Sequence, residues 1–414
     1  MTTPTVAVVY GFGAAGPAQI AKAARDLADV WFVVDSRDES TRAVADMLPR
    51  FGAGVVDLAT ATDADLRRLL ACAEGITTFA EDCIQRTSRI AALLGLPYHD
   101  EPTARLLTDK HLQREALNLA LRAATPATVV RTRADLAPAA AAVGFPLVAK
   151  PLTGSASAFT YRCDSVADLE LRLGDALDRG DGAAWAVEAL LTPGHHPAGD
   201  FLADYVSVES LAVGSVVRHL AITDKLPLAR PFRETGMVSP TALPPGVQAD
   251  VLTLAGDAVR ALGVRHGLTH TEVKLTPDGP RIIEVNGRLG GFVARLIDRA
   301  SGLDLVRLGL LAALGLPTGC PEPVFRSAAV WFGIVPPQSR VKVAAVPPSR
   351  DLRALPGVWR VDRFTEAGDV LDWEYGSGQR VADLWVDAPG LDAVPPLLDR
   401  LAAEAAGVVS FERI

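Results

Sequence analysis

The sequence predicts a protein of mixed α/β and α+β class with more than one domain. The N-terminal part alternates short apolar strands with helices, which is typical of a parallel sheet flanked by helices. A later stretch, Leu268–Phe292, holds two alternating strands around a turn that contains Pro and Gly, and further strands follow it. With 414 residues, the chain is long enough for about two to four domains.

The composition is that of a globular protein and argues against several classes of partner. Hydrophobic residues make up 49% and charged residues 22% of the chain. The net charge of −8 argues against nucleic acid, and the lack of an apolar run of about 18 residues argues against a membrane span. No basic segment opens the chain, so a cytoplasmic protein without a signal peptide is expected. The cysteines form no C-x-x-C pair and are expected to be reduced thiols: Cys72, Cys83, Cys163 and Cys320.

The first predicted domain, residues 1–103, opens with a glycine-rich turn between a strand and a helix. The strand Val6–Tyr10 is followed by Gly11–Gly16 in the pattern G-x-G-x-x-G, and Asp35 ends the next strand. This pattern is the dinucleotide-binding fingerprint, so an NAD-binding oxidoreductase is one hypothesis. The alternative is that the glycines only form a tight turn in a Rossmann-like domain.

The central hairpin carries the strongest functional pattern of the chain. Thr271–Leu275 and Arg281–Asn286 alternate as strands, and Pro277–Pro280 forms the turn between them. If the two strands pair about this turn, Glu272 and Glu284 lie near one another on neighbouring strands. Two adjacent carboxylates repel each other, so such a pair needs cations to hold it.

The oxygen atoms that the hairpin gathers suit a magnesium ion. Glu284, Asn286 and Arg288 share one face of the strand, because side chains alternate with period two. Glu272, Glu284 and Asn286 together form a hard, anionic set that fits Mg²⁺, or Mn²⁺, bound with a nucleotide phosphate. Arg288 is placed to stabilise negative charge on a reacting phosphoryl or carbonyl group. The alternative is a hairpin whose acids simply face water.

These residues resemble the signature of a known superfamily. The pattern Glu272, Glu284, Asn286 and Arg288 is similar to the magnesium and phosphate motif of the ATP-grasp carboxylate–amine ligases. The form IEVNGRLGG, followed by an apolar helix, is similar to the L-amino-acid ligases, which form dipeptides. The resemblance covers Thr2–Leu316 well and the last hundred residues less distinctly. The chain has no G-x-x-x-x-G-K-[ST] pattern, so a P-loop NTPase is not expected.

The resemblance implies an ATP-grasp fold with a Rossmann-like domain before it and a small α+β domain after it. Its expected boundaries are 1–103, then 104–316 in two parts (about 104–190 and 191–316), then 317–414. It implies ATP-dependent joining of a carboxylate to an amine through an acyl-phosphate, with amino acids as the expected substrates. A ligase or carboxylase for other substrates is the alternative. The C-terminal domain is expected to cover the cleft or to form the contact of a homodimer.

Two lysines and a small flexible segment are the candidate contacts of the ATP phosphates. The resemblance assigns Lys110, in the dipeptide Asp109-Lys110, to the phosphates. Lys150 ends an apolar strand, where a lysine needs an anionic partner, and is the second phosphate lysine and a candidate catalytic residue. The segment Leu152–Phe159, with Ser155 and Ser157, is expected to close over the phosphates as a lid.

The adenosine contacts are assigned by the resemblance alone. The adenine hinge is expected at Glu188, Ala189, Leu190 and Leu191. Within it, the backbone N–H of Leu190 is expected to donate to the ring. Tyr205 occupies the position where the family usually has an acid for the ribose, so Asp204 or Glu209 is the expected substitute.

The remaining candidates concern the substrates. The long connection after the strand pair predicts a substrate wall with Lys225 and Glu234, or alternatively a solvated crossover. Glu81 follows a parallel strand and is expected either to contact a substrate amino group or to cap a helix. His270 shares a strand face with Glu272 and is expected to contact the substrate carboxylate or the departing proton, with a structural role as the alternative.

Two further pairs follow from local sequence. Gly290 and Gly291 begin the predicted helix Leu289–Ala300, and their N–H groups are a predicted seat for a carboxylate. His195 and His196 lack metal-ligand spacing and are expected in an exposed loop. The C-terminal part is predicted to hold strands, a helix and a last strand, at Ala328–Val335, Arg340–Val346, Val358–Phe364, Arg380–Asp387, Ala393–Ala405 and Val408–Phe411.

Overall fold

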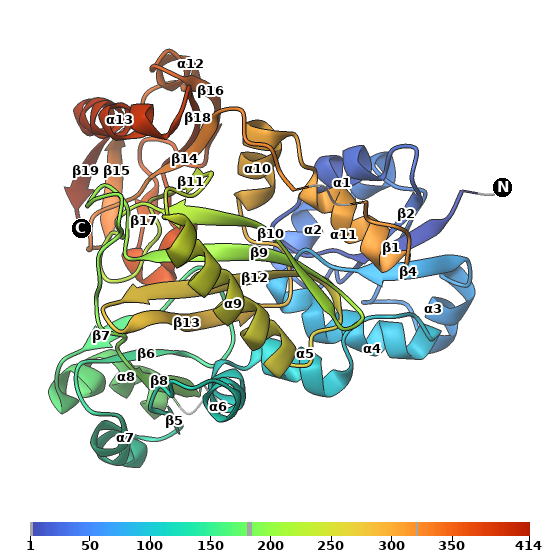
Figure 1. Ribbon diagram of the computed structural model, residues 1–414, viewed down its shortest axis with the longest axis horizontal. Coiled ribbons are helices and arrows are strands. Elements are labelled where there is room, and N and C mark those ends of the chain that lie inside the picture. The colour runs from blue at the N-terminus through green and yellow to red at the C-terminus, as the bar shows by residue number, and fades with distance from the viewer. Residues whose placement is uncertain (1–2, 180–183, 320–321) are drawn as a thin grey trace.

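A computed structural model describes residues 3–179, 184–319 and 322–414 of the chain. Cys320, one of the cysteines predicted to be reduced, lies outside these residues, and the other three are free thiols. The described strands form a parallel sheet near the N-terminus, a small antiparallel sheet, a large antiparallel sheet and a short three-stranded sheet. Figure 1 shows the small sheet below the large one and the N-terminal sheet beside both. No helix in the described ranges is long and apolar enough to cross a membrane.

The N-terminal sheet has the strand–helix alternation that the sequence predicts. Its parallel strands follow the order β3-β2-β1-β4. The strands are β1 (Thr5–Val9), β2 (Asp29–Val34), β3 (Gly54–Asp57) and β4 (Ala73–Thr77), and the helices are α1 (Pro17–Ala24), α2 (Glu39–Ala45), α3 (Asp63–Leu69) and α4 (Ile84–Leu94). The apolar side chains of β1 and β2 are buried against the helices, which accounts for their continuous hydrophobic runs.

The glycine-rich turn after β1 serves packing. A Cβ atom at Gly13 would lie 2.2 Å from the carbonyl oxygen of Phe79, so only glycine allows this approach. Ala14 N–H donates to the same carbonyl at 2.8 Å. The Asp35 carboxylate, which a dinucleotide ribose would need, is paired with Arg37 at 2.6 Å and with Arg86 at 3.2 Å. These contacts favour the alternative that the glycines form a tight turn, and they give no support to NAD binding.

The small sheet presents one face to two helices and the other to the site. Its antiparallel strands follow the order β5-β8-β6-β7. They are β5 (Ala127–Val130), β8 (Trp185–Ala189), β6 (Leu147–Pro151) and β7 (Tyr161–Cys163), and the helices of this region are α5 (Glu101–Thr108), α6 (Lys110–Ala120), α7 (Leu136–Val143) and α8 (Val166–Asp178). Leu147 and Ala149 pack in the core with α7 and α8, so alternation turns Lys150 to the opposite face.

The large sheet forms the centre of the molecule. Its order is β13-β12-β9-β10-β11-β14-β18-β16, with antiparallel neighbours throughout the described pairs. Its first five strands are β9 (Tyr205–Val213), β10 (Val216–Lys225), β11 (Gly236–Ser239), β12 (His266–Thr276) and β13 (Gly279–Asn286). Helix α9 (Pro245–Ala261) lies across one face (Figure 1) and shares a core with Val206 and Val208. Helices α10 (Val293–Ser301) and α11 (Leu305–Ala313) join the sheet to the N-terminal part.

The part of the chain after residue 316 is joined to the large sheet. Strand β14 pairs with β11, so the C-terminal part extends the large sheet. Trp331 of this strand also shares a hydrophobic core with Phe32 of the N-terminal sheet. The local predictions were nevertheless good, since the elements of this part are β14 (Ala328–Ile334), β15 (Val341–Ala345), α12 (Ser349–Arg353), β16 (Val358–Arg363), β17 (Val370–Leu371), β18 (Ala382–Ala388), α13 (Val394–Val408) and β19 (Ser410–Arg413).

Candidate active site

The central hairpin places the two predicted metal acids opposite each other. Strands β12 and β13 are antiparallel, and Glu272 and Glu284 are direct partners in their register. Asn286 lies opposite His270 two positions further along. The predicted turn joins the two strands, and a register shift between Glu272 and Val273, which skips Ile283, brings the two acids opposite each other. The apolar side chains of the opposite face, Val273, Ile282 and Val285, are buried against α9. The carboxylate pair therefore faces the small sheet.

Cations surround this pair. Lys110, the first residue of α6, lies with its Nζ 3.1 Å from Glu284 Oε1 and also donates to the carbonyl oxygen of Gly154 at 2.6 Å. Although burial alone would raise the pKa of Glu272, contacts with His270, Lys225 and Arg288 lower it to about 2. Glu272 is therefore ionised at neutral pH, as a metal ligand must be.

The donor set fits magnesium only with further oxygen atoms. Within residues 3–179, 184–319 and 322–414, no group of three or more His, Cys, Asp or Glu side chains is arranged to hold a metal by itself. The predicted set consists of two carboxylates and one amide. Since Mg²⁺ requires about six oxygen ligands and usually takes several from water or phosphates, a bound nucleotide would have to complete the site.

Arg288 connects the hairpin to the N-terminal sheet. Its Nε lies 2.9 Å from Glu81 Oε2, and its Nη2 donates to Asn286 Oδ1 at 3.3 Å. Burial raises the pKa of Glu81, with Arg288 opposing the shift. Glu81 begins η2 (Glu81–Cys83), and no side chain caps α4, so the capping alternative for Glu81 receives no support. A contact between Glu81 and a substrate amino group stays a prediction.

The predictions for Glu209 and Gly290 are wrong. Glu209 is fully buried in the middle of the large sheet, where one carboxylate oxygen is in short contact with His270 Nδ1 and the other accepts the N–H of Gly290 at 3.1 Å. It therefore cannot contact a ribose, and the Gly290 N–H is not free for a substrate carboxylate. Asp204, the other ribose candidate, is paired with Lys274 at 2.6 Å. The seat at Gly291 stays a prediction, since a Cβ there would meet nothing within 4 Å.

His270 is a buried cation between two acids. Burial would lower its pKa, but the carboxylates of Glu209 and Glu272 outweigh this effect and raise the pKa to about 9. Its Nε2 lies 3.6 Å from Glu272 Oε1. A protonated imidazole cannot accept a proton from a substrate, so the structure favours the alternative that His270 positions Glu272.

The raised pKa of His270 predicts a loss of stability in alkali. Because the pKa is about 9 in the folded chain and 6.5 in the reference state, the stabilisation is complete below pH about 6.5 and disappears as the pH rises through 9. We expect a loss of roughly 3 kcal/mol over this range. Thermal unfolding in the presence of EDTA should show a falling melting temperature in wild type but a much flatter profile in His270→Gln.

The control for this prediction is His195→Gln, because the His195 side chain is 91% exposed. This variant should follow the wild-type pH profile. Equal pH dependence in His270→Gln and wild type would contradict the assignment of the shift to His270.

Lys150 pairs with the buried carboxylate of Glu188, a residue of the predicted hinge. Lys150 Nζ lies 3.4 Å from Glu188 Oε1, and Arg114 Nη2 lies 3.2 Å from Glu188 Oε2. Burial raises the pKa of Glu188, but the two cations lower it overall. Arg114 was missed in the sequence, although it lies four residues after Lys110 and therefore on the same face of α6. The Glu188 side chain is fully engaged, so only its backbone is available to a base.

Removing Arg114 should destabilise the chain. The variant Arg114→Met leaves the buried Glu188 with Lys150 as its single cation and also removes the hydrogen bonds to the carbonyl oxygens of Ile282 and Ile283. Breaking a buried pair typically costs about 3–5 kcal/mol, so the thermal unfolding midpoint should fall by several degrees. The exposed Arg105→Met on α5 should leave it unchanged. An unaltered midpoint in Arg114→Met would show that this pair contributes no net stability.

The adenine donor predicted at Leu190 is wrong. Leu190 N–H donates to the carbonyl oxygen of Pro146 at 3.0 Å, continuing the ladder between β8 and β6. Ala189 N–H points the other way, to the carbonyl oxygen of Pro126 at 2.9 Å. The ladder then ends, and the Leu191 N–H has no acceptor in the described part of the chain. Among the predicted hinge residues, Leu191 therefore has an N–H that the β8–β6 ladder leaves unused.

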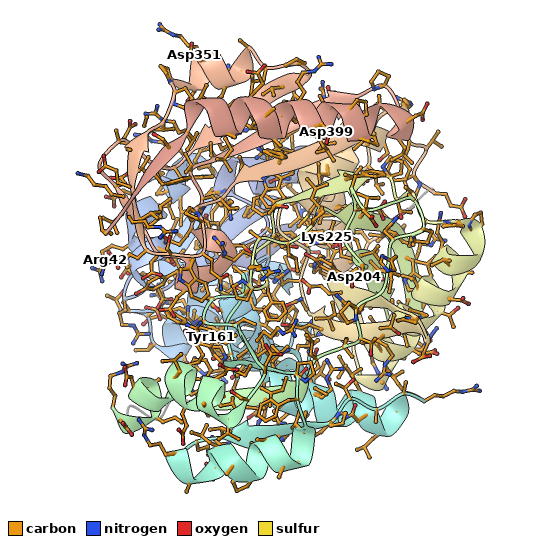
Figure 2. All side chains as sticks on the ribbon, turned by 90° about the vertical axis from the view of Figure 1, so that its left-hand side faces the viewer. Arg42, Tyr161, Asp204, Lys225, Asp351 and Asp399 are labelled. Carbon is orange, nitrogen blue, oxygen red and sulfur yellow. The ribbon has the colours of Figure 1, made fainter. Side chains whose placement is uncertain are left out.

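The predicted substrate wall forms a buried ion pair. Lys225 is fully buried, with its Nζ 2.7 Å from Glu234 Oε1 and 5.8 Å from the ring centre of Tyr205. The hydroxyl of Tyr205 lies 3.4 Å from the same Glu234 oxygen. Figure 2 shows Lys225, at the end of β10, and Asp204, just before β9, above Tyr161 of the small sheet. This buried pair gives no support to a solvated crossover at Lys225 and Glu234.

The double histidine divides into an exposed and a buried residue. His195 follows the expectation of an exposed loop, but His196 is buried, with its Nε2 3.3 Å from Asp224 Oδ1. Asp224 also accepts hydrogen bonds from the hydroxyl of Thr241 and the N–H of Ala242, each at 2.6 Å. His196 thus attaches the loop between β8 and β9 to strand β10 of the large sheet.

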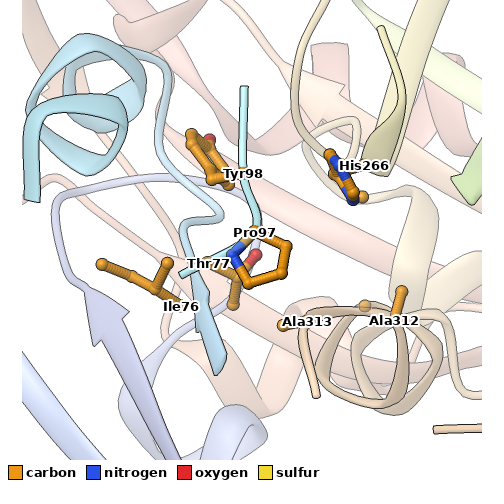
Figure 3. Close-up of a pocket in the computed structure, with 9 residues that line it drawn as sticks. Ile76, Thr77, Pro97, Tyr98, His266, Ala312 and Ala313 are labelled. Atoms are coloured by element: carbon orange, nitrogen blue, oxygen red, sulfur yellow. The ribbon is translucent and has the colours of Figure 1, made fainter. Parts of the chain in front are cut away.

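A small cavity elsewhere in the molecule is not a substrate site. It lies between the end of β4, the segment before α5, and α11, with Ile76, Pro97, Tyr98 and His266 among its lining residues (Figure 3). Its volume is about 10 Å³, which is room for at most about one water molecule.

A small and a large antiparallel sheet, with lysines and paired acids between them, are the arrangement of the ATP-grasp fold. A crystal structure of an L-amino acid ligase from Bacillus licheniformis matches the whole chain with a TM-score of 0.79, at 20% identity, and covers 99% of that protein. This likeness confirms the predicted fold class: the chain has the ATP-grasp fold. No family model matches the chain.

Two curated relatives are similar over more than half of the chain. Carnosine synthase 1 from Gallus gallus is 33% identical over 263 residues, which are 59% of this chain and 28% of that protein. An alanine–anticapsin ligase from Bacillus subtilis strain 168 is 28% identical over 250 residues, which are 57% of this chain and 53% of that protein. The matched segment therefore spans about half or less of each relative's length.

Proposed function

We propose that the protein is an ATP-dependent ligase that joins the carboxylate of one amino acid to the amine of another. The observation that carries this proposal is the direct pairing of Glu272 with Glu284, flanked by Lys110 and Arg288, within an ATP-grasp fold. The names of the similar proteins, a carnosine synthase, an alanine–anticapsin ligase and an L-amino acid ligase, support amide formation between amino acids.

The residues of the cleft divide into those for ATP and those for magnesium. Lys110, beside Glu284, and Lys150, beside Glu188, would neutralise the phosphates, and the lid would close over them. The free N–H of Leu191 and the backbone carbonyl of Glu188 would bind the adenine. Glu272, Glu284 and Asn286 would hold Mg²⁺ (or Mn²⁺), which supplies charge neutralisation to the triphosphate when bound.

The reaction then proceeds in two displacements. An oxygen of the substrate carboxylate attacks the γ-phosphorus of ATP, which forms an acyl-phosphate and releases ADP. The amine of the second substrate attacks the acyl carbon, and phosphate leaves as the amide forms and the amine proton is lost. Arg288, whose Nη2 lies 3.3 Å from Asn286 Oδ1, would stabilise the oxyanion of the tetrahedral intermediate. Exclusion of water protects the acyl-phosphate.

A screen of amino-acid pairs tests the proposal. The protein is incubated with ATP, Mg²⁺ and pairs of amino acids, and ADP release and amide formation are measured together. Release of ADP that requires both amino acids and equals the amide formed is the expected result. Release of ADP with bicarbonate or with a non-amino-acid carboxylate would favour the alternative ATP-grasp ligase or carboxylase. Binding of NADH without any ATP-dependent reaction would overturn the ligase.

A further inference from the structure

A short segment of the C-terminal part lies directly on the lid. We call residues 373–377, within η4 (Trp373–Gly378), the strap. The N–H of Phe159 donates to the carbonyl oxygen of Glu374 at 2.6 Å, and the N–H of Ser377 donates to the carbonyl oxygen of Ala156 at 2.7 Å. Two backbone hydrogen bonds of opposite direction therefore join the lid to a segment more than two hundred positions away in the sequence.

The fit between strap and lid is close at one glycine. A Cβ atom at Gly376 would lie 2.1 Å from the carbonyl oxygen of Ala156 and 2.6 Å from the nitrogen of Ala158. Gly376 also has a φ of 69°. Beside it, the rings of Tyr375 and Phe159 pack edge to face with their centres 5.0 Å apart. Only glycine at position 376 lets the strap reach the lid backbone.

The lid conformation depends on being held. Ala156, Ser157 and Phe159 have φ values of 58°, 55° and 51°, in the left-handed region that side chains other than glycine rarely adopt. Such backbone persists where the surroundings fix it. Lys110 holds the base of the lid through its N–H to Leu152 and its Nζ to Gly154. The strap holds the tip.

The other side of the strap contacts the substrate wall. The hydroxyl of Ser377 accepts the N–H of Glu234 at 2.8 Å. Glu234 is the partner of the buried Lys225. Arg380 donates to the carbonyl oxygen of Ser377 and so fixes the strap from behind. One segment therefore contacts both the lid and the backbone of the wall.

We propose that the strap is a positioning element that sets the phosphate lid and the Lys225–Glu234 wall in one fixed relation. This inference rests on the proposed function, because it takes the lid to cover ATP and the wall to face a substrate. It assigns positioning roles to Tyr375, Gly376 and Ser377. Its consequence is that nucleotide closure and substrate binding depend on each other through the C-terminal part.

The physical contact is tested without any ligand. In Gly376→Ala, the added methyl group displaces the lid, so hydrogen–deuterium exchange of the Phe159 and Ser377 amides should become faster. Gly378→Ala is the matched control, since a Cβ at Gly378 meets nothing within 4 Å. If Gly376→Ala does not fold, Tyr375→Ala replaces it, because Tyr375 is 54% exposed and its removal disturbs the core little. Unchanged exchange in both Gly376→Ala and Tyr375→Ala would overturn the proposal.

The catalytic consequence is tested by measuring KM and kcat separately in each variant. In Gly376→Ala, KM should rise about 10- to 100-fold for ATP and also for the amino acid at the wall, whereas Gly378→Ala should match wild type. ADP release should also exceed amide formation, because water reaches the acyl-phosphate and returns free acid and phosphate. Faster exchange with unchanged KM values would overturn the positioning role and leave a structural contact. A wild type without ligase activity would instead overturn the proposed function, while the exchange result would still decide the contact.

Discussion

Replacing Arg288 by alanine is expected to lower amide formation about 10²- to 10³-fold, because it removes a preorganised cation from the developing oxyanion. Arg288 also neutralises the buried Glu81, so the same variant should lose stability. The two effects must be separated before the loss of turnover is assigned to catalysis. Steady-state kinetics and thermal unfolding of the same preparations provide this separation.

A double-variant cycle with Glu81 gives the separation. Glu81→Gln removes the charge that Arg288→Ala leaves unpaired, so the double variant should recover much of the lost stability. It should not recover turnover, because the oxyanion still lacks its cation. Recovery of turnover together with stability would show that Arg288 acts by positioning the N-terminal part, and the proposed catalytic role would be wrong.

The features that sequence could predict are those set by neighbouring residues. The hairpin of β12 and β13 follows from a short turn and an alternating pattern on both sides, so the nearness of Glu272 and Glu284 was predictable. Their direct opposition was not, because a register shift between Glu272 and Val273 moves the pairing by one residue. An anionic partner was also predictable for Lys150, whose place in an apolar strand demanded one. That anion is Glu188, 38 positions later in the chain. From the sequence, Glu188 was predicted only as part of the adenine hinge.

The features that sequence could not predict depend on which distant segments become neighbours. Glu209 is an acid of the kind that binds a ribose, but it lies on a central strand of the large sheet and is buried against His270. The choice between Leu190 and Leu191 depends on which amide the β8–β6 ladder uses, and a shift of one residue reverses it. The pairing of β14 with β11 was also not predictable, because the partner of a strand is not visible in the strand itself.

Replacing Glu284 by glutamine is expected to weaken Mg²⁺-dependent nucleotide binding by at least about 10²-fold. The change preserves the shape of the side chain, but it removes one of the two charges that face each other on the hairpin. It also leaves Lys110 without its carboxylate partner, so Lys110 Nζ becomes more available to phosphate oxygens. Metal-free nucleotide binding should therefore weaken much less than binding of the Mg²⁺ complex.

This difference distinguishes a metal ligand from a residue that only holds Lys110. Calorimetric titration with a non-hydrolysable ATP analogue, with Mg²⁺ and with EDTA, measures both affinities for Glu284→Gln and for the exposed control Glu115→Gln on α6. A metal ligand predicts a loss confined to the Mg²⁺ titration. An equal loss in both titrations would mean that Glu284 acts through Lys110 alone. The hairpin would then carry a phosphate site without a metal, and the acid pair would need another cation to hold it.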